Sequence, residues 1–310
     1  LGDWGSSDLS SNLSGPISCS IFLVVEMKIT ESCIDCLLSR VMLECTLAHA
    51  SPLLTETTMT GCRMITNEIR SAPLSHPQIA SRIHRRAYEL LENPDPFAEL
   101  KRKGNQQALD VCRDVRNNLG TFRDYVLASV IGNTFDYGVK GHIVEENFSV
   151  FFKREFLKGL SIDHTDKIAP LCSRVVYLSD NCGEIVLDRL LIEYLKGQGS
   201  HVTLAVKEAP ILNDATLQDA RDLGLDTIAD QVTTTGGGAE IGICMDSIPD
   251  DLRKAISQCT IIIAKGMGNF ESLYEMDNLP PVAYLLAAKC KPVADELGVP
   301  VGSKIAVLRS

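Results

Sequence analysis

The stretch Val175-Val176-Tyr177-Leu178-Ser179-Asp180-Asn181-Cys182-Gly183-Glu184 decides the fold that this sequence predicts. Four apolar residues are followed by a short polar turn, and Glu184 then opens a run of apolar residues with helical spacing. A buried strand that ends in a turn and leads into a helix is the repeating unit of an open α/β sheet. Ligands of such sheets bind in the crevice at the carboxyl ends of the strands. The polar turn therefore predicts a binding site as well as a fold.

The same pattern continues through the second half of the chain. Residues 202–206 (Val-Thr-Leu-Ala-Val) lead to Asn213 and Asp214, and residues 261–264 (Ile-Ile-Ile-Ala) lead to Lys265. Strand and helix candidates alternate, which indicates right-handed crossovers and a largely parallel sheet with both faces covered. The strand candidates are 174–179, 202–207, 226–229, 260–264 and 304–308, and the helical stretches between them are near 184–196, 214–223, 249–258 and 282–297.

The first half of the chain has a helical pattern instead. Apolar residues recur at three- and four-residue spacing within 36–47 and 79–91, and little of this half is typical of strands. We therefore predict an α/β protein with a helical N-terminal domain, residues 27–157. This domain packs on a doubly wound, mostly parallel sheet domain, residues 158–310, and roofs the active site. Residues 1–26 are rich in Ser, Gly, Asp and Asn, so we predict a disordered extension there.

The residues at the predicted strand ends favour phosphate chemistry. Two carboxylates and an amide oxygen, from Asp180, Asp214 and Asn181, are hard ligands that suit Mg²⁺ or Mn²⁺ better than zinc. Lys265 is a point-charge phosphate ligand, and the glycines after it allow a close backbone approach. Asp and Asn are also the commonest turn and N-cap residues, so plain turns are the alternative interpretation.

Composition excludes several classes of partner. The chain has 310 residues, 45% hydrophobic and 23% charged, and its formal net charge is −10. Nucleic acids and anionic membranes attract a basic face, so neither is an expected partner. No apolar run approaches the roughly 20 residues that span a bilayer. We expect a cytoplasmic protein that binds a small anionic molecule.

The cysteines do not form a disulfide framework. Eleven of them occur at irregular spacing, as expected for reduced thiols in a cytosolic protein. Cys33 and Cys36 are three residues apart on a predicted helix and so share one face. Plain packing, a redox role and a zinc site remain open for this pair, although no second pair at zinc-finger spacing follows.

Four strings of residues occur in an order that resembles a known family. Together they are similar to the metal-dependent damage-control phosphatases, formerly domain of unknown function eighty-nine. Residues 93–105 and 132–138 resemble the helical region of that family, and the Cys-x-x-Cys at Cys33 resembles its archaeal-type branch. The similarity extends from Met27 to near the C-terminus. The four strings are Asp-Asn-Cys-Gly-Glu at 180–184, Pro-Ile-Leu-Asn-Asp-Ala-Thr at 210–216, Ala-Lys-Gly-Met-Gly-Asn-Phe-Glu at 264–271 and Ala-Lys-Cys at 288–290.

The resemblance implies a metal-dependent phosphatase that acts on small phosphorylated metabolites, such as sugar phosphates or damaged cofactor precursors. Asp180, Asn181 and Asp214 match the positions that bind the metal in the family. The resemblance favours Mn²⁺, with Co²⁺, Ni²⁺ and Mg²⁺ as alternatives. Either a water molecule or the Asp180 carboxylate could attack phosphorus, and the sequence leaves both open.

The resemblance also assigns residues to the substrate. Glu184 matches a carboxylate that contacts substrate or acts as an acid, although a first-turn Glu is also favoured by the helix dipole alone. Lys289 matches a second phosphate-contacting lysine, but Leu-Ala-Ala-Lys at 286–289 departs from the Arg-Thr-x-Lys string of one eukaryotic branch. The residues that match the phosphate-binding loop are Lys265, Gly266, Gly268 and Asn269.

Two residues of the helical half are expected to support the metal loop. Asn133 and Asp136 match positions from which the loop could be oriented. For Asn133, a role as the helix C-cap explains its presence nearly as well.

Two other functions are consistent with a similar fold. An S-adenosylmethionine-dependent carboxyl methyltransferase usually has a Gly-x-Gly turn after its first strand, whereas this turn has Gly183 alone. A non-catalytic sugar-phosphate sensor is disfavoured because Asp180, Asn181 and Asp214 are all present.

Overall fold

The structure is a computed structural model that describes residues 30–69, 74–133 and 148–309. The predictions for residues 1–26 and for Asp136 lie outside these ranges. None of the helices in these ranges combines the length and the apolar composition that crossing a membrane requires.

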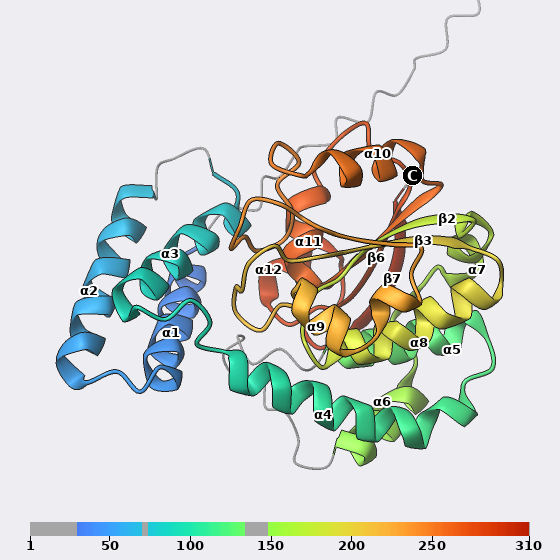
Figure 1. The fold of residues 1–310 in the computed structure, drawn as a ribbon, viewed down its shortest axis with the longest axis horizontal. Helices are drawn as coiled ribbons and strands as arrows, with labels where there is room; N and C mark the ends of the chain where they lie inside the picture. The colour runs from blue at the N-terminus through green and yellow to red at the C-terminus, as the bar shows by residue number, and fades with distance from the viewer. Residues whose placement is uncertain (1–29, 70–73, 134–147, 310) are drawn as a thin grey trace, which may run out of the picture.

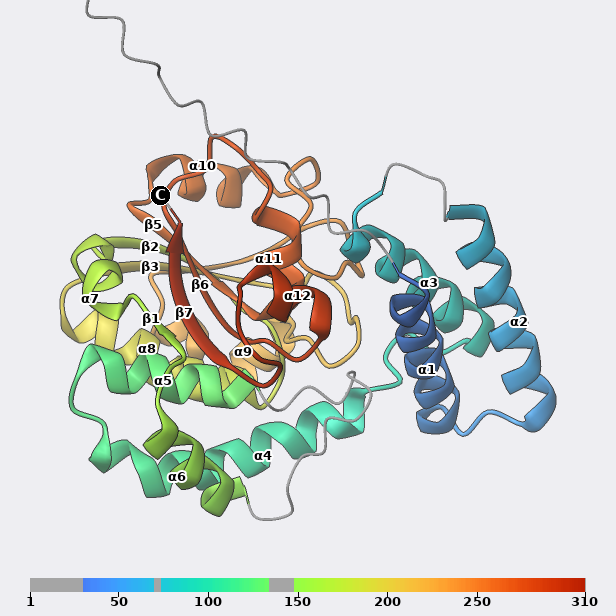
Figure 2. The ribbon, with the colours of Figure 1, turned by 180° about the vertical axis from the view of Figure 1, so that it is seen from behind.

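A sheet forms the centre of the molecule (Figures 1 and 2). It has seven strands in the order β1-β7-β6-β5-β2-β3-β4. Neighbouring strands are parallel except for β6 and β7, which are antiparallel. The predicted mostly parallel α/β fold is therefore confirmed. The strands are β1 (Ile162–Asp163), β2 (Arg174–Leu178), β3 (His201–Val206), β4 (Gln231–Thr234), β5 (Ile261–Lys265), β6 (Val282–Ala287) and β7 (Lys304–Arg309).

The order of the strands places a switch point between β2 and β5. From β2 the chain continues to β3 and β4 on one side, and then returns to β5 on the other side of β2. The connections that leave the carboxyl ends of β2 and β5 diverge there, which opens a crevice at that edge of the sheet.

Helices cover both faces of the sheet because strand residues point alternately to opposite sides. In β2, Val175 and Tyr177 face one apolar core, and Val176 and Leu178 face the other. The first core includes α4 (Ala98–Val115), α5 (Phe122–Gly132), α6 (Phe148–Lys158), α7 (Thr165–Ile168), α8 (Glu184–Gly197) and α9 (Leu217–Asp222). The second includes α10 (Asp250–Gln258), α11 (Gly266–Leu273) and α12 (Lys291–Glu296).

Three N-terminal helices form a separate bundle beside the sheet (Figures 1 and 2). They have their own apolar cluster, which reaches the sheet unit through Ile211 and Leu212 in the loop after β3. Helices α4 to α6 instead share the core of the sheet, although α4, α5 and all but the last residue of α6 lie within residues 27–157. The bundle consists of α1 (Glu31–Leu47), α2 (Pro52–Ile69) and α3 (His76–Leu91).

Two predicted elements are wrong in the structure. Residues 282–287 form strand β6, where the sequence predicts a helix over 282–297, and only 291–296 of that range is α-helical. The strand predicted at 226–229 begins later, at Gln231, and residues 225–227 form a 3₁₀ helix. The short strand β1 was not predicted, since two residues give no periodic pattern.

Candidate metal and phosphate site

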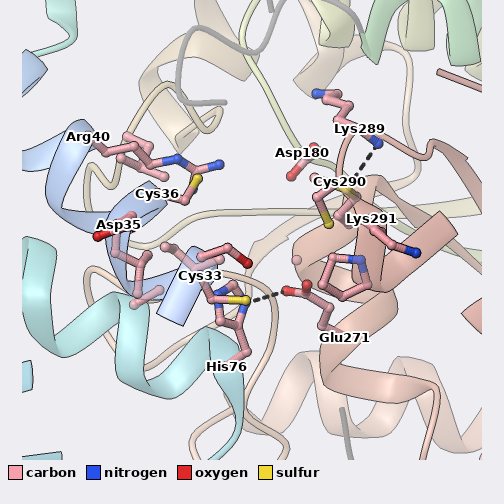
Figure 3. A pocket seen from close by; sticks show the side chains of 18 of the residues that line it. Cys33, Asp35, Cys36, Arg40, His76, Asp180, Glu271, Lys289, Cys290 and Lys291 are labelled. Atoms are coloured by element: carbon pink, nitrogen blue, oxygen red, sulfur yellow. Dashed lines mark hydrogen bonds and ion pairs between the residues drawn. The ribbon is translucent and has the colours of Figure 1, made fainter. Parts of the chain in front are cut away.

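A cavity of about 480 Å³ lies between the N-terminal helices and the carboxyl edge of the sheet (Figure 3). Helices α1 and α3 form one wall. The opposite wall comes from the turns that follow β2, β3 and β6 and from helix α11 after β5. The cavity therefore sits at the switch point and is roofed by the helical bundle, as the sequence predicts.

Three predicted metal ligands, Asp180, Asn181 and Asp214, all line this cavity. Backbone hydrogen bonds join the two turns that carry them, because the amide of Ala215 donates to the Asp180 carbonyl at 2.8 Å. Asn181 and Asp214 also pair as an isolated antiparallel bridge. The fold thus brings together two carboxylates and one amide from turns about thirty residues apart in the sequence.

The Asp180 carboxylate is held in one orientation. Its Oδ2 accepts hydrogen bonds from the side-chain amides of Asn181, at 2.6 Å, and Asn133, at 3.0 Å. Asn133, the residue at which α5 ends, also donates to Glu184 Oε2 at 2.7 Å and accepts from the Ala287 amide at 3.1 Å. One buried side chain therefore connects α5 to the ends of β2 and β6.

Gly266 forms a cradle for Asp180. Its φ of +75° lies in the region that favours glycine, and a Cβ at this position would stand 1.9 Å from Asp180 Oδ2. Only glycine lets the chain turn from β5 into α11 this close to the carboxylate.

Asp214 is positioned from two sides. Lys207, at the end of β3, lies with its Nζ 3.6 Å from Asp214 Oδ2 and is itself fully buried. Leu212, two residues before Asp214, has a φ of +47°, which is unusual for a side chain of this size. The Leu212 amide donates to the Tyr88 hydroxyl of α3 at 2.8 Å, so the helical bundle supports this turn directly.

The donor set fits a hard divalent ion. The amide nitrogen of Asn181 donates to the carboxylates of Asp180 and Glu184, which directs the amide oxygen away from them. Two carboxylate side chains and one amide side chain then line one cavity, a set suited to Mn²⁺ or Mg²⁺. In the described ranges, no group of three or more His, Cys, Asp or Glu side chains is arranged to hold a metal ion. The mixed carboxylate and amide set therefore remains the candidate.

Lys265 does not line the cavity but lies behind it. Its ammonium group contacts Glu184 Oε1, Asp188 Oδ1 at 2.8 Å and the Ser129 carbonyl at 3.2 Å, and all four residues are fully buried. Burial alone would lower the pKa of Lys265, but the carboxylates of Asp188 and Glu184 outweigh burial and raise this pKa. Burial also raises the pKa of Asp188, to about 6. The three N–H groups of the ammonium thus all have acceptors within the protein.

The other predicted substrate residues divide between the cavity wall and the layer behind it. Gly268 and Lys289 line the cavity, whereas Glu184, Gly266 and Asn269 do not. Asn269 donates its side-chain amide to the carbonyls of Ser179, at 3.0 Å, and Lys265, at 2.8 Å. It therefore ties the end of β2 to the end of β5 and keeps the crevice in shape.

Sequence reasoning missed three supporting residues. Lys207 could have been noticed as the lysine that ends the apolar run 202–206. Asp188 lies one helical turn after Glu184, which places both carboxylates on the same face. Asn105, in a string that resembles the family, accepts from the Gly183 amide at 2.6 Å and so supports the polar turn from α4. The predicted roles of the site residues themselves stay predictions.

Comparison with known proteins places the chain in a family. Residues 29–305 match the model of the damage-control phosphatase ARMT1-like domain. A protein named damage-control phosphatase from Archaeoglobus fulgidus is 43% identical over 90% of this chain and 99% of its own length. A damage-control phosphatase from Pyrococcus horikoshii is 34% identical over 74% of this chain and 80% of its own length.

A solved structure of the same family has a similar fold. The crystal structure of a duf89 family protein from Pyrococcus horikoshii has a TM-score of 0.82 and 28% identity, and the match covers 90% of this chain and 98% of that one. The family resemblance seen in the sequence strings is confirmed by the family model, the relatives and this structure. The chain belongs to the damage-control phosphatase ARMT1-like family.

Proposed function

We propose that this protein is a divalent-metal-dependent phosphatase of small phosphorylated metabolites, with sugar phosphates and damaged cofactor precursors as candidate substrates. The observation that carries the proposal is that Asp180, Asn181 and Asp214 line one cavity together with Lys289. The names of the relatives support the phosphatase activity. The volume of about 480 Å³ has room for a phosphoryl group and a small leaving group.

Each residue has a defined part in this proposal. Asp180, Asn181 and Asp214 hold a divalent ion, with Mn²⁺ favoured, and Asn133 keeps the Asp180 carboxylate in position. The bound ion supplies Lewis-acid polarisation of a phosphoryl oxygen. Lys289 provides a positive charge in the cavity wall for the phosphate. Helices α1 and α3 cover one side of the cavity and reduce the access of bulk water, which strengthens these electrostatic contacts.

The first test measures phosphate release from a panel of phosphorylated metabolites. We expect activity that EDTA abolishes and that Mn²⁺, Co²⁺ or Ni²⁺ restores, with Mg²⁺ giving a weaker effect. Rigorously metal-free protein that keeps full turnover would refute the metal-dependent mechanism. A parallel assay with labelled S-adenosylmethionine separates the methyltransferase alternative, and any metal-dependent turnover excludes a sensor without catalysis.

The second test removes the ligands. Asp180→Ala and Asp214→Ala should each weaken Mn²⁺ binding, measured by calorimetry, by at least the 10–100-fold that loss of outer-shell partners typically costs. Thermal melting checks that both variants fold. Asp246→Ala, which removes an exposed carboxylate away from the cavity, is the matched control and should bind Mn²⁺ as the wild type does. If either ligand variant kept wild-type affinity, that residue would not be a ligand.

A further inference from the structure

Three thiols line the same cavity as the proposed metal ligands. Ten cysteines fall within the described ranges, all of them free thiols, and five of these are buried. Of the five partly exposed ones, Cys33, Cys36 and Cys290 line the cavity, whereas Cys244 and Cys259 do not. The accessible thiols of this part of the chain are therefore concentrated where the substrate is proposed to bind.

Cys33 and Cys36 have the geometry of a pair that can be bridged. Both belong to the first two turns of α1 and lie on the face that also carries Arg40 into the cavity wall (Figure 3). Helix geometry places Cα atoms three residues apart at about 5 Å. Disulfides join Cα atoms that are about 4.4–6.8 Å apart, and this spacing meets that condition. They also need Cβ atoms about 3.5–4.5 Å apart, whereas those of residues three apart on a helix are about 5–6 Å apart, so the bridge requires the first turn of α1 to tighten. The Cys33 amide donates to the Thr30 side chain at 3.3 Å, which fixes the start of this helix.

Cys290 faces this pair from the other wall. It directly follows Lys289 and occupies the N-cap position of α12, where its side chain makes no capping hydrogen bond. Burial, and then the negative charge of Glu271, raise the pKa of Cys290 to about 11. Cys290 is therefore a protonated thiol at neutral pH and a poor nucleophile. The three thiols are not arranged as a metal site, since the described ranges contain no such group.

We propose that Cys33 and Cys36 form a reversible disulfide in the wall of the phosphate cavity. The oxidant is a small peroxide. One thiolate attacks the peroxide O–O bond, which gives a sulfenic acid and releases one water or alcohol molecule. The second thiol then attacks the sulfenic sulfur, and a second water leaves as the S–S bond forms. Two thiols are thereby oxidised and one peroxide is reduced, and a dithiol reductant reverses the reaction by exchange.

The proposed disulfide and the proposed phosphatase site lie in the same cavity, but neither proposal depends on the other. An anion bound between Lys289 and the metal ligands occupies the cavity that a peroxide must enter to reach Cys33 and Cys36. Phosphate together with Mn²⁺ should therefore slow oxidation of the pair.

The experiment uses the full reduced chain, treated with hydrogen peroxide and then alkylated. Trypsin releases residues 29–40 as one peptide that contains both thiols. We expect this peptide to lose two hydrogens in mass, to escape alkylation, and to regain both alkylation sites after dithiothreitol. Cys33→Ser and Cys36→Ser should each abolish the change, and Cys244→Ser, outside the cavity, should leave it intact.

Two results would overturn the dithiol. One is full alkylation of both thiols at a peroxide dose that modifies Cys244, and the other is a cross-link from Cys33 to Cys290. A disulfide that forms equally fast with and without phosphate and Mn²⁺ would instead contradict phosphate binding in this cavity. The two proposals can therefore fail separately.

Discussion

The ammonium group of Lys265 balances two buried carboxylates, those of Glu184 and Asp188. Lys265→Met would leave both acids buried without their cation, and loss of one partner of a buried ion pair typically costs about 3–5 kcal/mol. We expect a loss of that order in the free energy of unfolding, measured with urea, together with a loss of activity.

Lys103→Met is the matched control for this variant. Lys103 pairs with Glu99 on the surface of α4, where the pair has little effect on stability. A Lys265→Met protein of normal stability that had lost only turnover would favour the phosphate contact predicted from the sequence over the charge-balancing role.

Gly266 offers a second test at the scale of one residue. In Gly266→Ala, the new Cβ would meet the Asp180 carboxylate at 1.9 Å, so the carboxylate must move. We expect weaker Mn²⁺ binding by calorimetry as well as lower stability. Gly298→Ala is the control, because Gly298 has a similar φ of +65° but nothing lies within 4 Å of the place that its Cβ would occupy. Equal effects of the two variants on Mn²⁺ binding would show that only backbone strain matters.

The grouping of Asp180, Asn181 and Asp214 could be predicted, because residues at the carboxyl ends of neighbouring parallel strands must lie close together. The direction in which the Lys265 side chain points was not predicted. Ile261 and Ile263 face the core under α5 and α8, and Lys265 continues this alternation, so its side chain enters that helical layer. The family strings supply residue types, but the strand's pleat decides which side each one faces.

At the scale of whole elements, β6 shows why some assignments fail. Its sequence, Val-Ala-Tyr-Leu-Leu-Ala, is buried at every position, so it lacks the alternation that distinguishes a half-exposed strand. A short continuous apolar run cannot be separated from a buried helix by periodicity alone. Residues 282–287 form a strand because they pair with β5 on one side and with β7 on the other. A periodic pattern within these six residues does not reveal that pairing.

Strand β7 is tied to α6 by a charged contact with a pH dependence. Lys304 Nζ lies 2.6 Å from Glu155 Oε2. Burial alone would raise the pKa of Glu155, but hydrogen bonds from Lys158 and Lys304 lower it to about 2. The pKa of Glu155 is 4.5 in the unfolded chain and lower in the fold, so its carboxylate stabilises the fold above pH 4.5. This contribution disappears as the pH falls from 4.5 to about 2.

Glu155→Gln should therefore lower the free energy of unfolding by roughly 2–3 kcal/mol at pH 7 and by much less near pH 2. Urea unfolding across this range measures the difference. The exposed Glu99→Gln is the control and should follow the wild-type curve closely. A constant gap between Glu155→Gln and the wild type at all pH values would exclude the titration of Glu155 as the cause.

At the scale of the whole molecule, the cavity lies between two units with separate apolar cores. The bundle of α1 to α3 contacts the sheet unit through apolar residues and through polar bonds, such as that of Arg85 with Glu240. The apolar contacts come from Phe97, Leu100, Ile211, Leu212, Ala239 and Ile241. A ligand in the cavity touches both units and stabilises their contact by mass action. We expect Mn²⁺ with phosphate to slow hydrogen exchange in α1 and α11 but not in α10, which lies away from the cavity. Slower exchange confined to α11 would show that the bundle takes no part in binding.

The pairing of β1 with β7 has a consequence for how the protein is made. Ribosomes release the chain from its N-terminus, so Ile162 emerges long before its partner Ile305. Until then β1 has no neighbour and β6 is an open edge of the sheet, the kind of edge that invites pairing between different chains. The sheet is completed only when β7 inserts between them. Until β7 is in place, the incomplete sheet therefore carries an unpaired edge of the kind that promotes association between chains.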